Sequence, residues 1–193
     1  MSVLKLILPA LMVVCSCSSL CSQTTGNTVS DSISTAQVQA SRQFFWDSLP
    51  KRNGWTNDFE KLFSEIEIQM LDSIITVFEK ETSNQICIVT VDSFHISKER
   101  FDDLALHIGN TWGIGQQDKS NGIIICISKV YRRIRIYNGR DILPLLSMGE
   151  TKEIISQHFI ARFKTGDYFN GTLNGLNAIV GTIRQKLNTK TNN

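Results

Sequence analysis

Two short runs of apolar, mostly β-branched residues constrain the fold of this chain more than any other feature. Residues 85–92 read QICIVTVD and residues 123–128 read IIICIS, with almost no alternation of polar and apolar positions. Strands of this kind are typically covered on both faces, as in a parallel sheet. Between them, the apolar residues of 97–112 recur at helical spacing until Gly113 breaks the pattern. The sequence therefore predicts a βαβ unit with two parallel strands.

More helices and one more strand are predicted around this unit. Ser64 and Glu67 form a capping box ahead of an apolar stripe, which predicts a helix that begins there. Residues 133–138 alternate polar and apolar side chains, which favours an edge-like antiparallel strand. Further helices are predicted at about 150–163 and 168–187. These elements predict an α/β fold with a small mixed sheet that contains the βαβ unit and an antiparallel hairpin.

The chain begins like an exported protein. An apolar run over residues 6–14 follows a basic residue and precedes small residues and cysteines, which is typical of a secretory signal peptide. The run is shorter than the ~20 residues that a membrane-spanning helix needs. Residues 1–16 are therefore predicted to be a signal peptide. The mature protein is expected in the bacterial cell envelope, facing the periplasm or exposed at the surface.

Cys17 is the predicted site of lipid attachment. A small residue precedes it directly and Val14 stands three positions before it, as in a loose lipobox. Cleavage before Cys17 and acylation of the chain end would hold the mature protein on a membrane. Two alternatives stay open. Cys15 or Cys21 could carry the lipid instead, or an ordinary signal peptidase could cut near Ser22 and discard the cysteines.

Polar segments flank the predicted domain on both sides. Residues 22–45 are rich in Ser, Thr, Gln and Asn and poor in large apolar side chains until Phe44. Such a segment buries too little surface to offset its ordering entropy, so a flexible tether is predicted over residues 17–49. The domain is assigned to residues 50–187, and a polar tail to residues 188–193.

The charge of the chain is nearly balanced. The sequence has 20 Lys and Arg and 18 Asp and Glu residues. Removal of residues 1–16 takes away one Lys, which leaves 19 − 18, or +1. This excess is too small to attract phosphate backbones, so nucleic acid is not a predicted partner.

The loop at residues 112–122, WGIGQQDKSNG, directly precedes the second apolar strand and resembles the signature loop of the TPM domain. This family takes its name from a thylakoid lumen protein, a photosystem II accessory protein and a nematode receptor modulator. Matching stretches follow the same order at 55–59, 79–86 and 163–168, so the resemblance covers residues 50–187. It implies a three-layer α/β/α domain, often tethered to a membrane by a lipid or a helix.

The resemblance also implies an acidic site at the loop end of the sheet. Asp58, Asp118 and Asn121 match the acidic positions of the family and would hold calcium or magnesium, which prefer oxygen ligands. From the residues alone, Asp92 ends the first apolar strand, at the edge where open α/β sheets bind ligands. Ser120 replaces an acidic residue that many relatives carry, which removes one charge from such a site. The alternative interpretation is that these residues are ordinary turn formers.

Two functions from different classes follow from the resemblance. The favoured prediction is a membrane-tethered module for the interaction, assembly or maintenance of membrane protein complexes, with envelope or membrane proteins as partners and calcium bound for structure. The alternative is an acid phosphatase or related hydrolase, as the plant member is described, in which Asp58, Asp118 and Asn121 hold the metal. Phosphoryl transfer needs positioned positive charge, and no recognised sequence motif supplies it. Whether the chain is an enzyme is left open.

Overall fold

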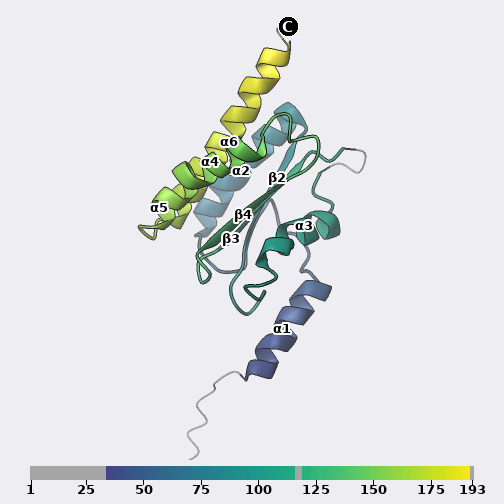
Figure 1. The fold of residues 1–193 in the computed structure, drawn as a ribbon, viewed down its shortest axis with the longest axis vertical. Coiled ribbons are helices and arrows are strands. Elements are labelled where there is room, and N and C mark those ends of the chain that lie inside the picture. The colour runs from purple at the N-terminus through teal and green to yellow at the C-terminus, as the bar shows by residue number, and fades with distance from the viewer. Residues whose placement is uncertain (1–33, 116–118, 192–193) are drawn as a thin grey trace, which may run out of the picture. The chain divides into compact units, whose positions relative to one another are not determined.

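The parallel strands lie in a single four-stranded sheet. The structure, a computed structural model, describes residues 34–115 and 119–191. Within these residues the strand order is β1-β2-β3-β4; β1, β2 and β3 are parallel and β4 is antiparallel to β3 (Figure 1). The predicted βαβ unit and the antiparallel edge strand are confirmed. The strands are β1 Thr56–Asp58, β2 Gln85–Thr90, β3 Gly122–Ser128 and β4 Arg133–Asn138.

Helices cover both faces of this sheet, so the α/β fold class predicted from the sequence is confirmed. In Figure 1, α2 and the helices from α4 to α6 lie on one side, and α3 lies on the other. Helix α2 begins with the capping box that the sequence predicted at Ser64 and Glu67. No helix within the described residues is long and apolar enough to cross a membrane. The helices are α1 Thr35–Asp47, α2 Glu65–Thr82, α3 Phe101–Trp112, α4 Met148–Ile154, η1 Ile155–Ile160, α5 Ala161–Phe163 and α6 Tyr168–Thr191.

The larger core lies between the sheet and the pair α2 and α6. Apolar side chains from β2, β3, both helices and η1 are fully or almost fully buried there. The helix predicted over about 150–163 has a π-helical middle, η1, which directs the buried Phe159 against α6. Gly175 of α6 accommodates this ring, because a Cβ at that position would overlap it. The core includes Leu71, Ile75, Phe78, Ile86, Ile88, Ile123, Ile125, Ile127, Leu176, Ile179 and Ile183.

A smaller core lies on the opposite face, beneath α3. Alternate residues of β2 and β3 point there, among them Cys87 and Cys126, which are free thiols. Burial raises the pKa of Cys87 to about 12 and raises that of Cys126 as well. Both groups therefore stay protonated and serve as small apolar side chains. Phe101, Leu104 and Ile108 of α3 complete this core.

Helix α1 corrects the tether that the sequence predicted over residues 17–49. Residues 35–47 are helical, with a capping box at Ser34, and Phe45 is only 5% exposed in the smaller core. Trp46 stacks on His107 at 4.0 Å, and the Arg42 side chain donates to the backbone oxygen of Ser93 at 2.7 Å. The polar composition of this segment conceals the few side chains that pack it onto the domain. Residues 1–33, which include the predicted signal peptide and Cys17, lie outside the described residues.

Candidate functional site

Asp58 fixes the loop that follows β1. It ends that strand opposite Thr90, which ends β2. Its carboxylate accepts the backbone N–H of Leu62 at 3.0 Å and that of Phe63 at 2.8 Å, and it also accepts the Thr90 hydroxyl. A carboxylate has about four acceptor positions, so most of them are already used. Asp58 therefore has a structural role that does not depend on a cation.

Asn121 is placed at the other end of the parallel strands. It directly precedes β3, whose first residue, Gly122, lies opposite Gln85 at the start of β2. Its side-chain amide donates to the Ser83 backbone oxygen at 2.6 Å, and the Gln85 side chain accepts the Gly115 N–H at 2.8 Å. These bonds join the loops that enter β2 and β3.

The structure does not bring Asp58 and Asn121 together. Asp58 ends a parallel strand and Asn121 precedes the start of another. They are therefore separated by the six residues of β2, which is about 20 Å at ~3.3 Å per residue. Ligands of one calcium ion lie at about 2.3 to 2.6 Å from it, so these two residues cannot share an ion. The prediction that Asp58 and Asn121 belong to the same metal site is therefore wrong. Asp118 lies outside the described residues, and its pairing with Asn121 stays a prediction.

The other carboxylates at the carboxyl ends of the strands also hold loops. Asp92 accepts the N–H of Phe94 at 2.8 Å and contacts the His95 ring at 2.7 Å. Glu60 accepts the N–H groups of Lys129 at 2.8 Å and Val130 at 2.9 Å in the β3–β4 turn. Partial burial raises the pKa of Glu60, against the lowering effect of these two donors. Across the described ranges, 34–115 and 119–191, no three His, Cys, Asp or Glu side chains lie where they could hold a metal ion.

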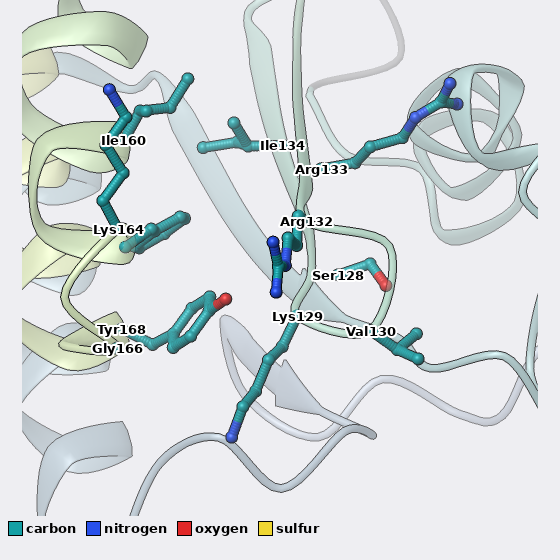
Figure 2. Close-up of a pocket in the computed structure, with 11 residues that line it drawn as sticks. Ser128, Lys129, Val130, Arg132, Arg133, Ile134, Ile160, Lys164, Gly166 and Tyr168 are labelled. Carbon is teal, nitrogen blue, oxygen red and sulfur yellow. The ribbon is translucent and has the colours of Figure 1, made fainter.

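A groove lies beside this end of the sheet, between the β3–β4 turn and the connection from α5 to α6. It encloses about 740 Å³, which is within the usual range for ligand pockets, about 300 to 1,000 Å³. Figure 2 shows the Arg132 guanidinium in the space between the turn and Tyr168, whereas Arg133 points away. The lining residues are Ser128, Lys129, Val130, Arg132, Arg133, Ile134, Ile160, Phe163, Lys164, Gly166 and Tyr168.

The groove combines an apolar wall with a cationic rim. Ile134, Ile160 and Phe163 are half-buried, and the Phe163 ring stacks on Tyr168 at 4.6 Å. Burial is the main cause that raises the pKa of the Tyr168 hydroxyl, so this group remains a hydrogen-bond donor at neutral pH. The wall offers apolar contact and the rim offers positive charge, side by side.

Three cations of this rim have no carboxylate partner. In the part of the chain that the structure describes, no Asp or Glu lies within ion-pair distance of Lys129, Arg132 or Lys164, and no residue that lines the groove is acidic. Arg133 differs, because it donates to the Lys98 backbone oxygen at 3.0 Å and lies 3.9 Å from Asp102. The groove can therefore bind an anion without displacing an internal ion pair.

The conformation of the turn fixes the position of Arg132. Its backbone has φ 51°, in the left-handed region, and its N–H donates to Lys129 O at 3.1 Å. A residue with a Cβ adopts this conformation at a cost of about 1 to 2 kcal/mol. Glu60 holds the other side of the turn. Arg132 is therefore presented on a turn whose shape is fixed by internal hydrogen bonds.

Comparison with known proteins gives the family. The TPM domain family matches residues 56–182 of the chain. The chain belongs to the TPM domain family. The N-terminal domain of a P. gingivalis protein has a similar fold, with 21% identity, a TM-score of 0.64 and coverage of 75% of this chain and 89% of that one. The BA42 protein of Bizionia argentinensis is similar at 18% identity, with a TM-score of 0.56 and coverage of 66% and 85%. No curated protein matches the chain significantly.

Sequence reasoning did not find the groove of this TPM domain. The basic residues of the β3–β4 turn were visible as a cluster at 129–133, but Ile160, Phe163 and Tyr168 come from a segment about 30 residues later. No spacing rule connects two loops of this kind. The useful signal was the position of the turn at the carboxyl end of β3, where open α/β sheets bind ligands.

Proposed function

We propose that this TPM domain is an interaction module for envelope or membrane proteins, held on a membrane by lipid at Cys17, and that it binds its partners through the groove. The observation that carries the binding role is the set of three cations, Lys129, Arg132 and Lys164, that line the groove without a carboxylate partner among the described residues. Charge left unpaired beside apolar surface favours the docking of a partner.

The use of the nearby carboxylates also supports a binding role. Asp58, Glu60 and Asp92 accept hydrogen bonds from the backbone of the loops around the strand ends. Their bonds give this end of the sheet a fixed shape. A pre-formed surface binds a partner at a lower entropic cost than one that must be ordered on binding.

Photocrosslinking in intact cells tests the interaction role. A photoreactive residue at Val130, which lines the groove and is 53% exposed, should give a discrete protein adduct. The same residue at Met70 on α2, which is 46% exposed, is the matched control and should not give this adduct. An adduct that forms at Val130 and is lost with Arg132→Ala supports the proposal. The same products from both positions would contradict it.

The lipid anchor has its own test. Cys17→Ser should release the protein from the membrane fraction and remove the lipid mass from the N-terminal peptide. Cys15→Ser and Cys21→Ser are the matched controls and should leave both readouts unchanged. Release by one of the control variants, with Cys17→Ser still lipidated, would assign the anchor to another cysteine. Cleavage near Ser22 in the wild type would overturn lipid anchoring altogether.

The alternative function, a cation-dependent phosphatase, is favoured by one observation. The cations of the groove are of the type that stabilises the charge of a transferred phosphoryl group. Hydrolysis of p-nitrophenyl phosphate by the purified protein, with and without calcium and magnesium, tests it. Turnover that requires calcium or magnesium and falls with Arg132→Ala would favour the enzyme. Absence of turnover under all conditions agrees with the interaction module.

A further inference from the structure

We infer that the groove and the free edge of β4 together bind an extended acidic peptide segment, whose carboxylates lie at Arg132 and whose apolar side chains lie on the wall of the groove. The inference rests on the proposed interaction function and names the chemistry of the partner. It depends on three features of the described residues: the unpaired cations, the apolar wall and an unpaired strand edge.

The cationic rim selects for carboxylates held in a defined position. Arg132 has a planar guanidinium that binds a carboxylate through two parallel hydrogen bonds, and the turn fixes its backbone. Lys129 and Lys164 flank it as point charges on the same groove. The acidic side chains of a partner segment therefore meet one directional cation, Arg132, and two less directional ones.

The apolar wall lies beside these cations. Ile134, Ile160 and Phe163 are half-buried, so they retain apolar surface that a ligand can cover. A free inorganic anion would use the rim and leave the wall exposed. A segment in which an acidic and an apolar side chain stand two residues apart would use both, because residues i and i+2 of an extended strand point to the same side.

The edge of β4 supplies the backbone partner for such a segment. In the described residues β4 pairs with β3 only, so its second edge carries unpaired N–H and C=O groups. An extended peptide can add to an edge of this kind as a further strand. Neither phosphate nor a lipid headgroup offers the alternating N–H and C=O groups that would use it.

The register of β4 places these groups beside the groove. Gly139 donates its N–H to Gly122 O at 2.8 Å, which makes these two opposite residues a hydrogen-bonded pair. Bonded and non-bonded pairs alternate along an antiparallel ladder. The odd-numbered residues of β4 therefore bond to β3. The even-numbered residues Ile134 and Ile136 direct their backbone N–H and C=O groups away from β3. Ile134 also lines the groove, so the free edge and the groove meet at this residue.

The charges around the groove favour a peptide over a membrane surface. Arg133 and Arg135 of β4 both lie 3.9 Å from Asp102 of α3, so the basic character beside the strand is offset within α3. Other cations without a carboxylate partner among the described residues, such as Lys61, Lys152 and Arg162, do not line the groove. A flat anionic membrane would need a broader basic face, whereas a single segment in the groove meets the three unpaired cations.

The test uses short capped peptides with the repeat Glu-Glu-Leu-Leu, in which a Glu and a Leu share each face of the strand, and isothermal titration calorimetry on the full-length mature protein. The wild type should bind this peptide, and replacement of Glu by Gln should abolish binding. Arg132→Ala should weaken binding about tenfold or more, because a charge-assisted bidentate contact is lost. Lys152→Ala, an exposed cation on α4, is the matched control and should leave the affinity unchanged.

Two N-methylated peptides test the strand edge separately from the side chains. Each carries N-methyl groups on alternate residues, in one register or the other, and both keep all side chains. Strand addition requires that one of them binds like the parent while the other loses binding, since only one row of N–H groups faces β4. Equal affinity of both would overturn the strand addition.

The remaining outcomes separate this inference from the proposed function. Binding of inorganic phosphate or of phosphatidylglycerol vesicles that depends on Arg132, without binding of the acidic peptide, would overturn the inference. If the Val130 crosslink to a partner forms in cells but no acidic peptide binds, the interaction function stands and the peptide chemistry is wrong. If neither forms, both are wrong.

Discussion

The two ends of the parallel strands use their polar side chains differently. At the carboxyl end, Asp58 and Glu60 are hydrogen-bonded to loop backbone, while Arg132 has no carboxylate partner among the described residues. At the amino end, Gln85 and Asn121 bond across to neighbouring loops. The difference shows that acidic side chains at a strand end are not by themselves a binding site. The groups that remain available for a ligand here are the cations.

The first prediction tests how tightly the amino end is closed. A Cβ at Gly139 would overlap the backbone carbonyl of Ser120, which cannot move without its loop. Gly139→Ala should therefore lower the free energy of unfolding by about 3 kcal/mol, as measured by urea denaturation. Gly181→Ala is the control, because a Cβ there meets no atom within 4 Å. Equal stability of the two variants would contradict a closed amino end.

The second prediction concerns the structural role of Asp58 at the carboxyl end. Asp58→Asn replaces one acceptor oxygen by a donor that faces the N–H groups of Leu62 and Phe63. The free energy of unfolding in EDTA should fall by about 2 kcal/mol. Asp103→Asn on the exposed surface of α3 should have little effect. A loss of stability seen only with calcium present would instead make Asp58 a metal ligand.

The third prediction separates binding from stability at Arg132. Arg132→Gly relieves the cost of φ 51° for a residue with a Cβ and removes the guanidinium. The protein should become more stable by about 0.5 kcal/mol, because the flexibility of Gly in the unfolded chain offsets part of the gain. Its affinity for the acidic peptide should fall. If stability and binding fall together, Arg132 is mainly a structural residue.

The smallest expected effect is a pH dependence of stability. Glu150, which follows the loop after β4, accepts hydrogen bonds from Lys186 and Ser147, which lower its pKa to about 2. A folded-state pKa below the ordinary value of 4.5 means that the contribution to stability is complete above about pH 4.5 and is lost as pH falls toward 2. Glu150→Gln should weaken the pH dependence of the urea midpoint in this window. At neutral pH the midpoint of the variant should vary with pH as that of the wild type does. An unchanged slope would contradict the shift.

The central part of the fold could be predicted from the sequence. The runs at 85–92 and 123–128 identified the two central strands, because only strands covered on both faces lack alternation. Helix α1 could not be predicted in the same way. Its docking depends on Phe45, whose neighbours Phe59 and His95 come from distant loops, so no local pattern reveals it.

The candidate site was harder to predict because β1 is only three residues long. A strand this short has no recognisable pattern of its own, so no local signal decides at which end of the sheet Asp58 lies. Once β1 is seen to run parallel to β2, the separation of Asp58 from Asn121 follows from topology alone. The groove also depends on two loops that are distant in sequence. The separation of Asp58 from Asn121 and the formation of the groove both depend on how segments distant in sequence are placed in the fold, which residue type does not reveal.

Ligand recognition is expected at the carboxyl end of the strands, in the groove at Arg132. The most direct measurement is an NMR titration of the mature protein with the Glu-Glu-Leu-Leu peptide. Amide shifts should change at residues 129–136 and 160–168 and remain constant at 83–85 and 121–122. Shift changes concentrated at 83–85 and 121–122 would contradict it.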